Sequence, residues 1–159
     1  MNELHIREAT RADLGAIVAM ENRMFSYNQL SRRSLRHFID ARSAHFLVAD
    51  AAATLIGYAL VCYRAGSRLA RLYSLCADTG ASGRRGVGRE LLKQAEMHAR
   101  ARGAATMLLE VKDDNQPALR LYAAMQYETF DRYEDYYEDG GHALRLRKPL
   151  VVGAAGGSR

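Results

Sequence analysis

The sequence GRRGVGRELL, residues 83–92, says more about this chain than any other stretch. Its three glycines bring bare backbone to the start of a helix, so that a ligand can approach the amide groups closely. The first turn of such a helix has unpaired N–H groups and the positive end of the helix dipole. Together with the charges of Arg84, Arg85 and Arg89, these features predict a phosphate-binding site. The alternative is an ordinary glycine-rich turn before a basic helix.

Two well-known nucleotide motifs do not fit this segment. No Lys-Ser or Lys-Thr pair follows the last glycine, so the segment is not a P-loop. The glycine order is GxxGxG and not GxGxxG, and a dinucleotide fold needs more βαβ units than 159 residues with this pattern provide. Both motifs are therefore excluded.

Length and composition predict one globular domain. The chain has 159 residues, 48% of them hydrophobic and 26% charged, which are ordinary values for a domain with a real core. We expect this domain to span residues 1–150, and residues 151–159 to form a disordered tail. No apolar run is long enough for a membrane span, and the N-terminus lacks the features of a signal peptide.

The cysteines and the net charge narrow the environment and the partners. Cys62 and Cys76 lie in apolar segments without metal-ligand spacing, which indicates reduced thiols, no metal and a cytoplasmic protein. A net charge of +5 favours an anionic partner, either nucleic acid or a phosphate-bearing cofactor. Aromatic residues do not interleave with the basic ones, so direct nucleic-acid binding is not expected.

Hydrophobic periodicity and turn residues predict the element order β-α-α-β-β-β-α-β-α-β-β. Strands at residues 45–49, 55–63 and 69–77 would form an antiparallel meander. The strand at residues 106–111 follows a helix, which favours a parallel pairing. The expected class is α/β (α+β mixed), with a mixed, mostly antiparallel sheet of about seven strands flanked by four helices.

Capping residues mark where helices begin. Thr10, with Asp13 three residues later, has the capping-box pattern. Asn115 would cap a later helix that carries Pro117 in its first turn. The inner face of the first helix should include Met24.

Residues 83–89 resemble the pyrophosphate loop of the GNAT superfamily of acyl-CoA-dependent N-acetyltransferases, whose pattern is Q/R-x-x-G-x-G/A. LEV at residues 109–111, followed by Asn115, Ala118 and Tyr122, is similar to the family's L-E-V…N…A…L-Y run. The resemblance covers residues 4–150 and implies a single GNAT domain that uses acetyl-CoA. It also implies transfer of the acetyl group to a primary amine by direct attack in a ternary complex.

The segment YYEDGGHAL, residues 136–144, looks like the Y-Y-x-x-G-x-x-A segment of N-terminal protein acetyltransferases of the ribosomal-protein alanine type. This resemblance implies a protein α-amine as the acceptor. A small amine is one alternative, although the basic surface disfavours cationic small amines. A non-catalytic acyl-CoA-binding module is another alternative. Both a monomer and a homodimer stay open.

Three positions depart from the family pattern. Gly83 stands where the family has Gln or Arg, and Arg84 beside it is a possible substitute. The loop at residues 77–86 lacks the usual proline and is one residue longer. Gln126 replaces the usual glycine, so we expect the turn at this position to differ.

The resemblance implies chemical roles for two side chains. Glu110 corresponds to the base that removes a proton from the amine, directly or through water; its alternative role is a structural carboxylate paired with an arginine. A free α-amino group has a pKa of about 8 and needs only a modest base. Tyr122 corresponds to the phenol that protonates the departing thiolate, and its alternative role is a core aromatic.

The resemblance also implies two binding regions. The acceptor would lie between Phe25 and Tyr27 on one side and Tyr136 and Tyr137 on the other. No metal is expected. The expected acetyl-CoA site consists of Leu75, Cys76, Ala77, Gly83, Arg84, Arg85, Gly86, Val87, Gly88, Arg89 and Asn115.

Overall fold

A computed structural model describes residues 3–26, 29–78, 85–137 and 139–150. Seven strands form one sheet in the order β1-β2-β3-β4-β5-β7-β6. The strands are β1 (Leu4–Glu8), β2 (Ala44–Ala51), β3 (Thr54–Tyr63), β4 (Leu69–Ala77), β5 (Thr106–Lys112), β6 (Glu128–Tyr133) and β7 (Ala143–Pro149). The α-helices of the described ranges are α1 (Leu14–Met24), α2 (Arg32–Asp40), α4 (Val87–Ala101) and α5 (Gln116–Ala124). The expected fold class is confirmed.

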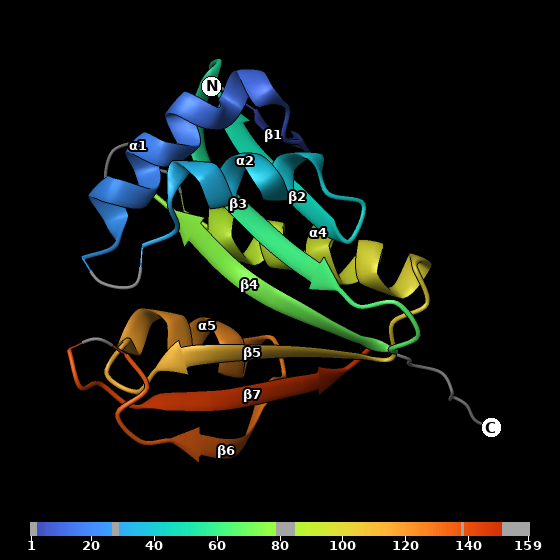
Figure 1. The fold of residues 1–159 in the computed structure, drawn as a ribbon, viewed down its shortest axis with the longest axis vertical. Coiled ribbons are helices and arrows are strands. Elements are labelled where there is room, and N and C mark those ends of the chain that lie inside the picture. Colours follow the sequence, from blue (N-terminus) through green and yellow to red (C-terminus); the bar gives the residue numbers. More distant parts are fainter. Residues whose placement is uncertain (1–2, 27–28, 79–84, 138, 151–159) are drawn as a thin grey trace.

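Helices cover both faces of the sheet (Figure 1). On one face, α1 and α2 bury Ile17 and Leu35 against β2 and β3. On the other face, α4 and α5 bury Leu91 and Tyr122 against the centre of the sheet. The amphipathic stripes of these helices therefore explain two separate cores, one on each side of the sheet.

The sheet opens between β4 and β5. These strands are parallel, whereas the other neighbouring strands are antiparallel. Their pairing covers only three residues of β4, from Leu69 to Arg71, and the two strands then diverge (Figure 1). Backbone groups beyond Arg71 on this edge of β4 therefore face an opening and not a neighbouring strand.

A β-bulge lies where β4 leaves β5. Leu60 and Val61 are consecutive in β3, but they pair with Ser74 and Leu72, so Tyr73 is an extra residue in β4. Leu72 belongs to the core under α4, whereas Cys76 belongs to the core under α1 and α2. A bulge bends the strand that carries it, so this residue helps to separate β4 from β5.

The helix caps are largely as expected. The backbone N–H of Thr10 donates to Asp13 at 2.7 Å, which completes the capping box at a short 3-10 turn before α1. The Asn115 side chain accepts a hydrogen bond from the N–H of Ala118 at 3.2 Å. The expectation for Met24 is wrong, since this side chain at the last position of α1 is 40% exposed.

The turn at Gln126 also differs from expectation. Gln126 has φ +75°, so the chain keeps a left-handed conformation there without a glycine. The N–H of Gln126 donates to the carbonyl of Ala123, which ends α5. A left-handed conformation costs a residue with a Cβ about 1–2 kcal/mol, and the packing of Met125 and Tyr127 in the core holds it in place.

Candidate active site

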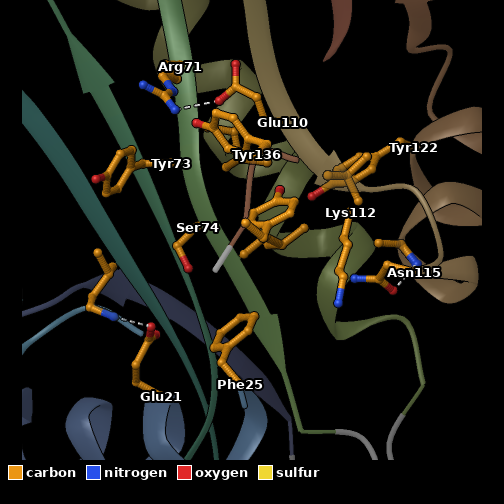
Figure 2. A pocket seen from close by; sticks show the side chains of 16 residues that line it. Glu21, Phe25, Arg71, Tyr73, Ser74, Glu110, Lys112, Asn115, Tyr122 and Tyr136 are labelled. Carbon is orange, nitrogen blue, oxygen red and sulfur yellow. Dashed lines mark hydrogen bonds and ion pairs between the residues drawn. The ribbon is translucent and has the colours of Figure 1, made fainter. Parts of the chain in front are cut away.

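A cavity of about 200 Å³ lies at the opening between β4 and β5. Its walls come from the end of α1, from both diverging strands, from α5 and from the segment after β6. Figure 2 shows Glu110 and Arg71 at one end, and Glu21 and Phe25 at the other. The lining residues are Glu21, Phe25, Leu30, Arg71, Leu72, Tyr73, Ser74, Leu75, Glu110, Val111, Lys112, Asn115, Ala118, Tyr122, Tyr136 and Tyr137.

The glycine segment leads into α4 as the sequence predicts. Gly86 has φ +82° and immediately precedes Val87, the first residue of α4. Gly88 is helical, and a Cβ added to it would lie 3.5 Å from Leu121 of α5. Arg89 is exposed in the first turn of α4. The N-terminus of α4 thus lies beside Leu121 of α5 and presents N–H groups of its first turn to a ligand.

The expected cofactor site also includes Arg85, Gly83 and Arg84. Arg85 is exposed just before Gly86. Gly83 and Arg84 lie outside the described residues.

The end of β4 divides its side chains between two environments. Leu75 lines the cavity. Ala77 packs against the core under α4. Cys76 is buried on the opposite side of the sheet, and its burial raises the pKa of the thiol to about 12. The Cys76 side chain is therefore directed away from the cavity, and only its backbone is available there.

Glu110 lies between two arginines at one end of the cavity. One carboxylate oxygen is 2.5 Å from Nη2 of Arg71, and the other is 3.2 Å from Nε of Arg145. The Glu110 side chain is 9% exposed. Each oxygen keeps a second lone-pair site, so the carboxylate is still able to accept a hydrogen bond from water or from an amine. Its structural pairing and its role as a base are therefore compatible.

Tyr122 extends from α5 into the cavity. Burial raises the pKa of its phenol, which keeps the hydroxyl protonated as a donor requires. Its ring packs edge-on against Tyr127 at 5.6 Å between centroids. Tyr127 in turn donates to Glu96 at 2.7 Å, and Lys148 bonds the other oxygen of Glu96 at 2.7 Å. This buried network fixes the position of the Tyr122 ring.

The expected acceptor walls partly converge. Phe25 at the end of α1 lines the cavity, as do Tyr136 and Tyr137 from the opposite side. The rings of Tyr136 and Tyr137 meet edge-on at 5.0 Å. Tyr27 lies outside the described residues. An ion pair between Lys112 of β5 and Asp139 holds the segment after β6 against the cavity.

Sequence reasoning missed Arg71, Ser74 and Lys112, which all line the cavity. The partner of Arg71 across the gap depends on the β4–β5 register, which sequence alone does not give. The position of Ser74 depends on the bulge at Tyr73. Lys112 directly follows the recognised LEV run, and its place after that run was the available signal.

Glu21 was missed as well. It is 2% exposed on α1, accepts a hydrogen bond from Leu30 N–H at 2.7 Å and another from the Tyr58 hydroxyl. Burial and this hydrogen bond raise the pKa of Tyr58. Glu21 on α1 therefore links Leu30, before α2, to Tyr58 of β3.

No cluster of three or more His, Cys, Asp or Glu side chains in the described ranges could hold a metal ion. No helix in the same ranges is both long and apolar enough to span a membrane.

The sequence is similar to a family of acetyltransferases and to two acetyltransferases of other organisms. The model of the Acetyltransferase (GNAT) family matches residues 14–127. Streptothricin acetyltransferase from Streptomyces lavendulae is 32% identical over 114 residues, which are 69% of this chain and 60% of that protein. The chain thus spans less than two thirds of that relative. N-alpha-acetyltransferase RimI from Mycobacterium tuberculosis is 30% identical over 156 residues, covering 87% of this chain and 88% of the relative.

Solved structures share the fold. The ribosomal-protein-S18-alanine N-acetyltransferase from Escherichia coli superposes with a TM-score of 0.83 at 22% identity. The superposition covers 94% of this chain and 96% of that one. At this identity the similarity establishes the architecture and leaves the acceptor open.

Proposed function

The chain belongs to the Acetyltransferase (GNAT) family, and on that premise we propose that it acetylates a protein N-terminal α-amine with acetyl-CoA. The observation that carries this proposal is the cavity at the opening of the sheet. It brings Glu110 and Tyr122 from different elements to one space, between aromatic side chains of a size suited to a peptide end. The free cysteines Cys62 and Cys76 support a reducing, cytoplasmic setting.

We propose that the pyrophosphate of acetyl-CoA binds at the N-terminus of α4. Gly86 and Gly88 leave space beside the backbone, and Arg85 and Arg89 supply positive charge. The pantetheine arm would then follow the free edge of β4 at Leu75, where backbone groups have no partner strand. Asn115, at the start of α5, would contact this arm. The thioester would reach the cavity between Glu110 and Tyr122.

The reaction requires three acts. Glu110 accepts a proton from the amine, directly or through a water molecule held at its remaining lone-pair sites. The neutral amine attacks the thioester carbonyl, and the tetrahedral intermediate expels the thiolate. Tyr122 donates its proton to that thiolate, because its buried phenol is protonated at neutral pH.

A small-amine acceptor is the second candidate. The relative named streptothricin acetyltransferase favours it, whereas the relative named RimI, which aligns over more of its length, favours an α-amine. The cavity of about 200 Å³ would hold either kind of amine. Turnover of acetyl-CoA with N-terminal peptides, lysine peptides and small amines decides between them. Selective turnover of peptides with a free α-amine supports the proposal, and selective turnover of small amines contradicts it.

Binding of the cofactor is tested separately by calorimetry with acetyl-CoA. A variant with Gly86→Val and Gly88→Leu should lose binding, because bulky side chains would cover the amides of the first turn. Gly66→Ala is a matched control, since Gly66 also has a positive φ but lies in the turn between β3 and β4. Equal affinity of the double variant and the wild type would contradict the assignment of the loop.

A further inference from the structure

The cavity contains a primary amine that belongs to the protein itself. Lys112, at the end of β5, lines the same cavity as Glu110 and Tyr122. Its side chain is 13% exposed and lines this cavity together with Tyr122 and Asn115 (Figure 2). We propose that Lys112 is a site of self-acetylation, an inference that rests on the proposed use of acetyl-CoA at this cavity.

The reaction at Lys112 is the same acyl transfer with an internal acceptor. The ammonium group first loses a proton to water or to the paired carboxylate of Asp139. The neutral Nζ attacks the thioester carbonyl, so a C–N bond forms and the C–S bond breaks. Coenzyme A leaves as a thiol with a proton from Tyr122, the second proton lost by Nζ restores the Tyr122 phenol, and one proton in total is released to solvent.

The reaction should be slow and should compete with the acceptor. A lysine amine has a pKa of about 10.4, against about 8 for an α-amine, so far less of it is neutral at pH 7. The ammonium group is also held in an ion pair with Asp139. Proximity to the thioester works in the opposite direction, because it replaces a bimolecular encounter with a positioned one. Self-acetylation is therefore expected when acetyl-CoA is present without an acceptor.

Acetylation of Lys112 would change the acceptor side of the cavity. Lys112 and Asp139 form an ion pair, and Asp139 also accepts a hydrogen bond from Gly141 N–H at 2.9 Å. An acetyl group removes the positive charge and with it the pair. The segment that carries Tyr136 and Tyr137 would then lose this ion pair with β5. The modification would lower the affinity for the acceptor more than the affinity for acetyl-CoA.

The sequence contains few lysines, so acetylation can be compared at each of them. Of the 23 lysine and arginine residues, the lysines are Lys93, Lys112 and Lys148. Lys93 is 52% exposed on α4 and serves as the control for acetylation from solution. Lys148 is paired with buried Glu96 and serves as the control for a shielded amine.

The experiment follows acetyl occupancy at each lysine by peptide mass spectrometry, with the full chain incubated in acetyl-CoA without an acceptor. We expect Lys112 to be acetylated at least about 10-fold faster than Lys93, because it is held beside the thioester. Tyr122→Phe should slow acetylation of Lys112 and leave that of Lys93 unchanged. An acceptor peptide should also reduce the modification of Lys112.

Two variants at Lys112 test whether loss of its charge lowers the affinity for the acceptor. Lys112→Arg keeps a cation beside Asp139 and removes the amine, whereas Lys112→Gln imitates the acetylated side chain. The Gln variant should have a higher KM for the acceptor than the Arg variant, with equal affinity for acetyl-CoA. If Lys112 reacts no faster than Lys93 while acetyl-CoA binds and acceptors turn over, the inference is overturned and the proposed function stands. If calorimetry shows no binding of acetyl-CoA, both fail.

Discussion

The wall of the cavity formed by α5 differs from the wall formed after β6. The first, which we call the core wall, consists of Asn115, Ala118 and Tyr122, and the buried network behind Tyr122 supports it. The second, the aromatic wall, consists of Tyr136 and Tyr137. Tyr136 is 41% exposed, and an ion pair near the surface holds its segment to β5. One wall is part of the core, and the other is attached to it.

In the proposed function, the core wall takes part in acetyl transfer and the aromatic wall in the choice of acceptor. A thioester and its proton donor need a fixed geometry, which a packed core provides. The core wall lies within residues 14–127, the range that the family model matches, whereas the aromatic wall lies outside that range. The two relatives are named for different acceptors, although both are acetyltransferases. We therefore propose that the acetyl-transfer chemistry common to both relatives belongs to the core wall.

The largest expected effect is at Tyr122 in the core wall. Tyr122→Phe keeps the ring and removes the proton donor, so kcat should fall by about 10²- to 10⁴-fold. The thermal midpoint and the affinity for acetyl-CoA should stay close to those of the wild type. Steady-state rates and a thermal melt on one preparation give both numbers. Normal kcat with a lower melting temperature would make Tyr122 a packing residue only.

The next effect tests Glu110, which lies at one end of the cavity (Figure 2). Glu110→Gln should reduce kcat/KM for the acceptor by about 10²-fold or more near pH 6, where an α-amine of pKa about 8 is protonated. The deficit should shrink toward pH 9, since the amine is then neutral without help. A pH profile of both proteins measures this trend. A loss of equal size at every pH would assign Glu110 a purely structural role between Arg71 and Arg145.

A third variant separates support from chemistry within the core wall. Tyr127→Phe removes the hydroxyl that donates to buried Glu96, which should destabilise the fold by about 1–3 kcal/mol. For a domain of this size, each kcal/mol lowers the melting temperature by roughly 2–4 °C. Because the ring still packs on Tyr122, kcat should change much less than in Tyr122→Phe. Equal losses of kcat in both variants would show that the two hydroxyls act as one unit.

In the aromatic wall, Tyr136→Ala should act on the acceptor. We expect the acceptor KM to rise by about 2- to 10-fold, the equivalent of the ~0.5–1.5 kcal/mol of an aromatic contact. The Kd for acetyl-CoA should not change, because Tyr136 belongs to the aromatic wall. Initial rates at varied acceptor and calorimetry with the cofactor distinguish these quantities. A weaker affinity for acetyl-CoA would mean that the aromatic wall also holds the cofactor.

The smallest effect concerns the turn that follows α5. Gln126→Gly should stabilise the fold by about 1 kcal/mol, because glycine adopts the left-handed conformation without the cost of a Cβ. Kinetic constants should be those of the wild type, since the turn keeps its shape. A denaturant titration measures the gain. A loss of stability would show that the Gln126 side chain contributes more than its backbone strain costs.

The sequence predicted the fold and the core wall better than the rest of the site. Alternation and caps such as Asn115 are local properties, and the LEV run fixes the place of Glu110 along the chain. Arg71 and Arg145 flank Glu110 through strand order and register, which arise from contacts distant in sequence. For the same reason, the links from Glu21 to Leu30 and from Lys112 to Asp139 were not predictable from local patterns.

Because of the bulge at Tyr73, the shape of the cavity depends on the number of residues in β4. Leu72 and Leu75 pack against the same core although they are three positions apart, an odd spacing that a regular strand would place on opposite faces. Tyr73 is the extra residue of the bulge. It bends β4 two positions beyond Arg71, the last residue of β4 that pairs with β5. Deleting Tyr73 would preserve the inward and outward pattern while straightening the strand. The opening thus depends in part on one extra residue of backbone in β4.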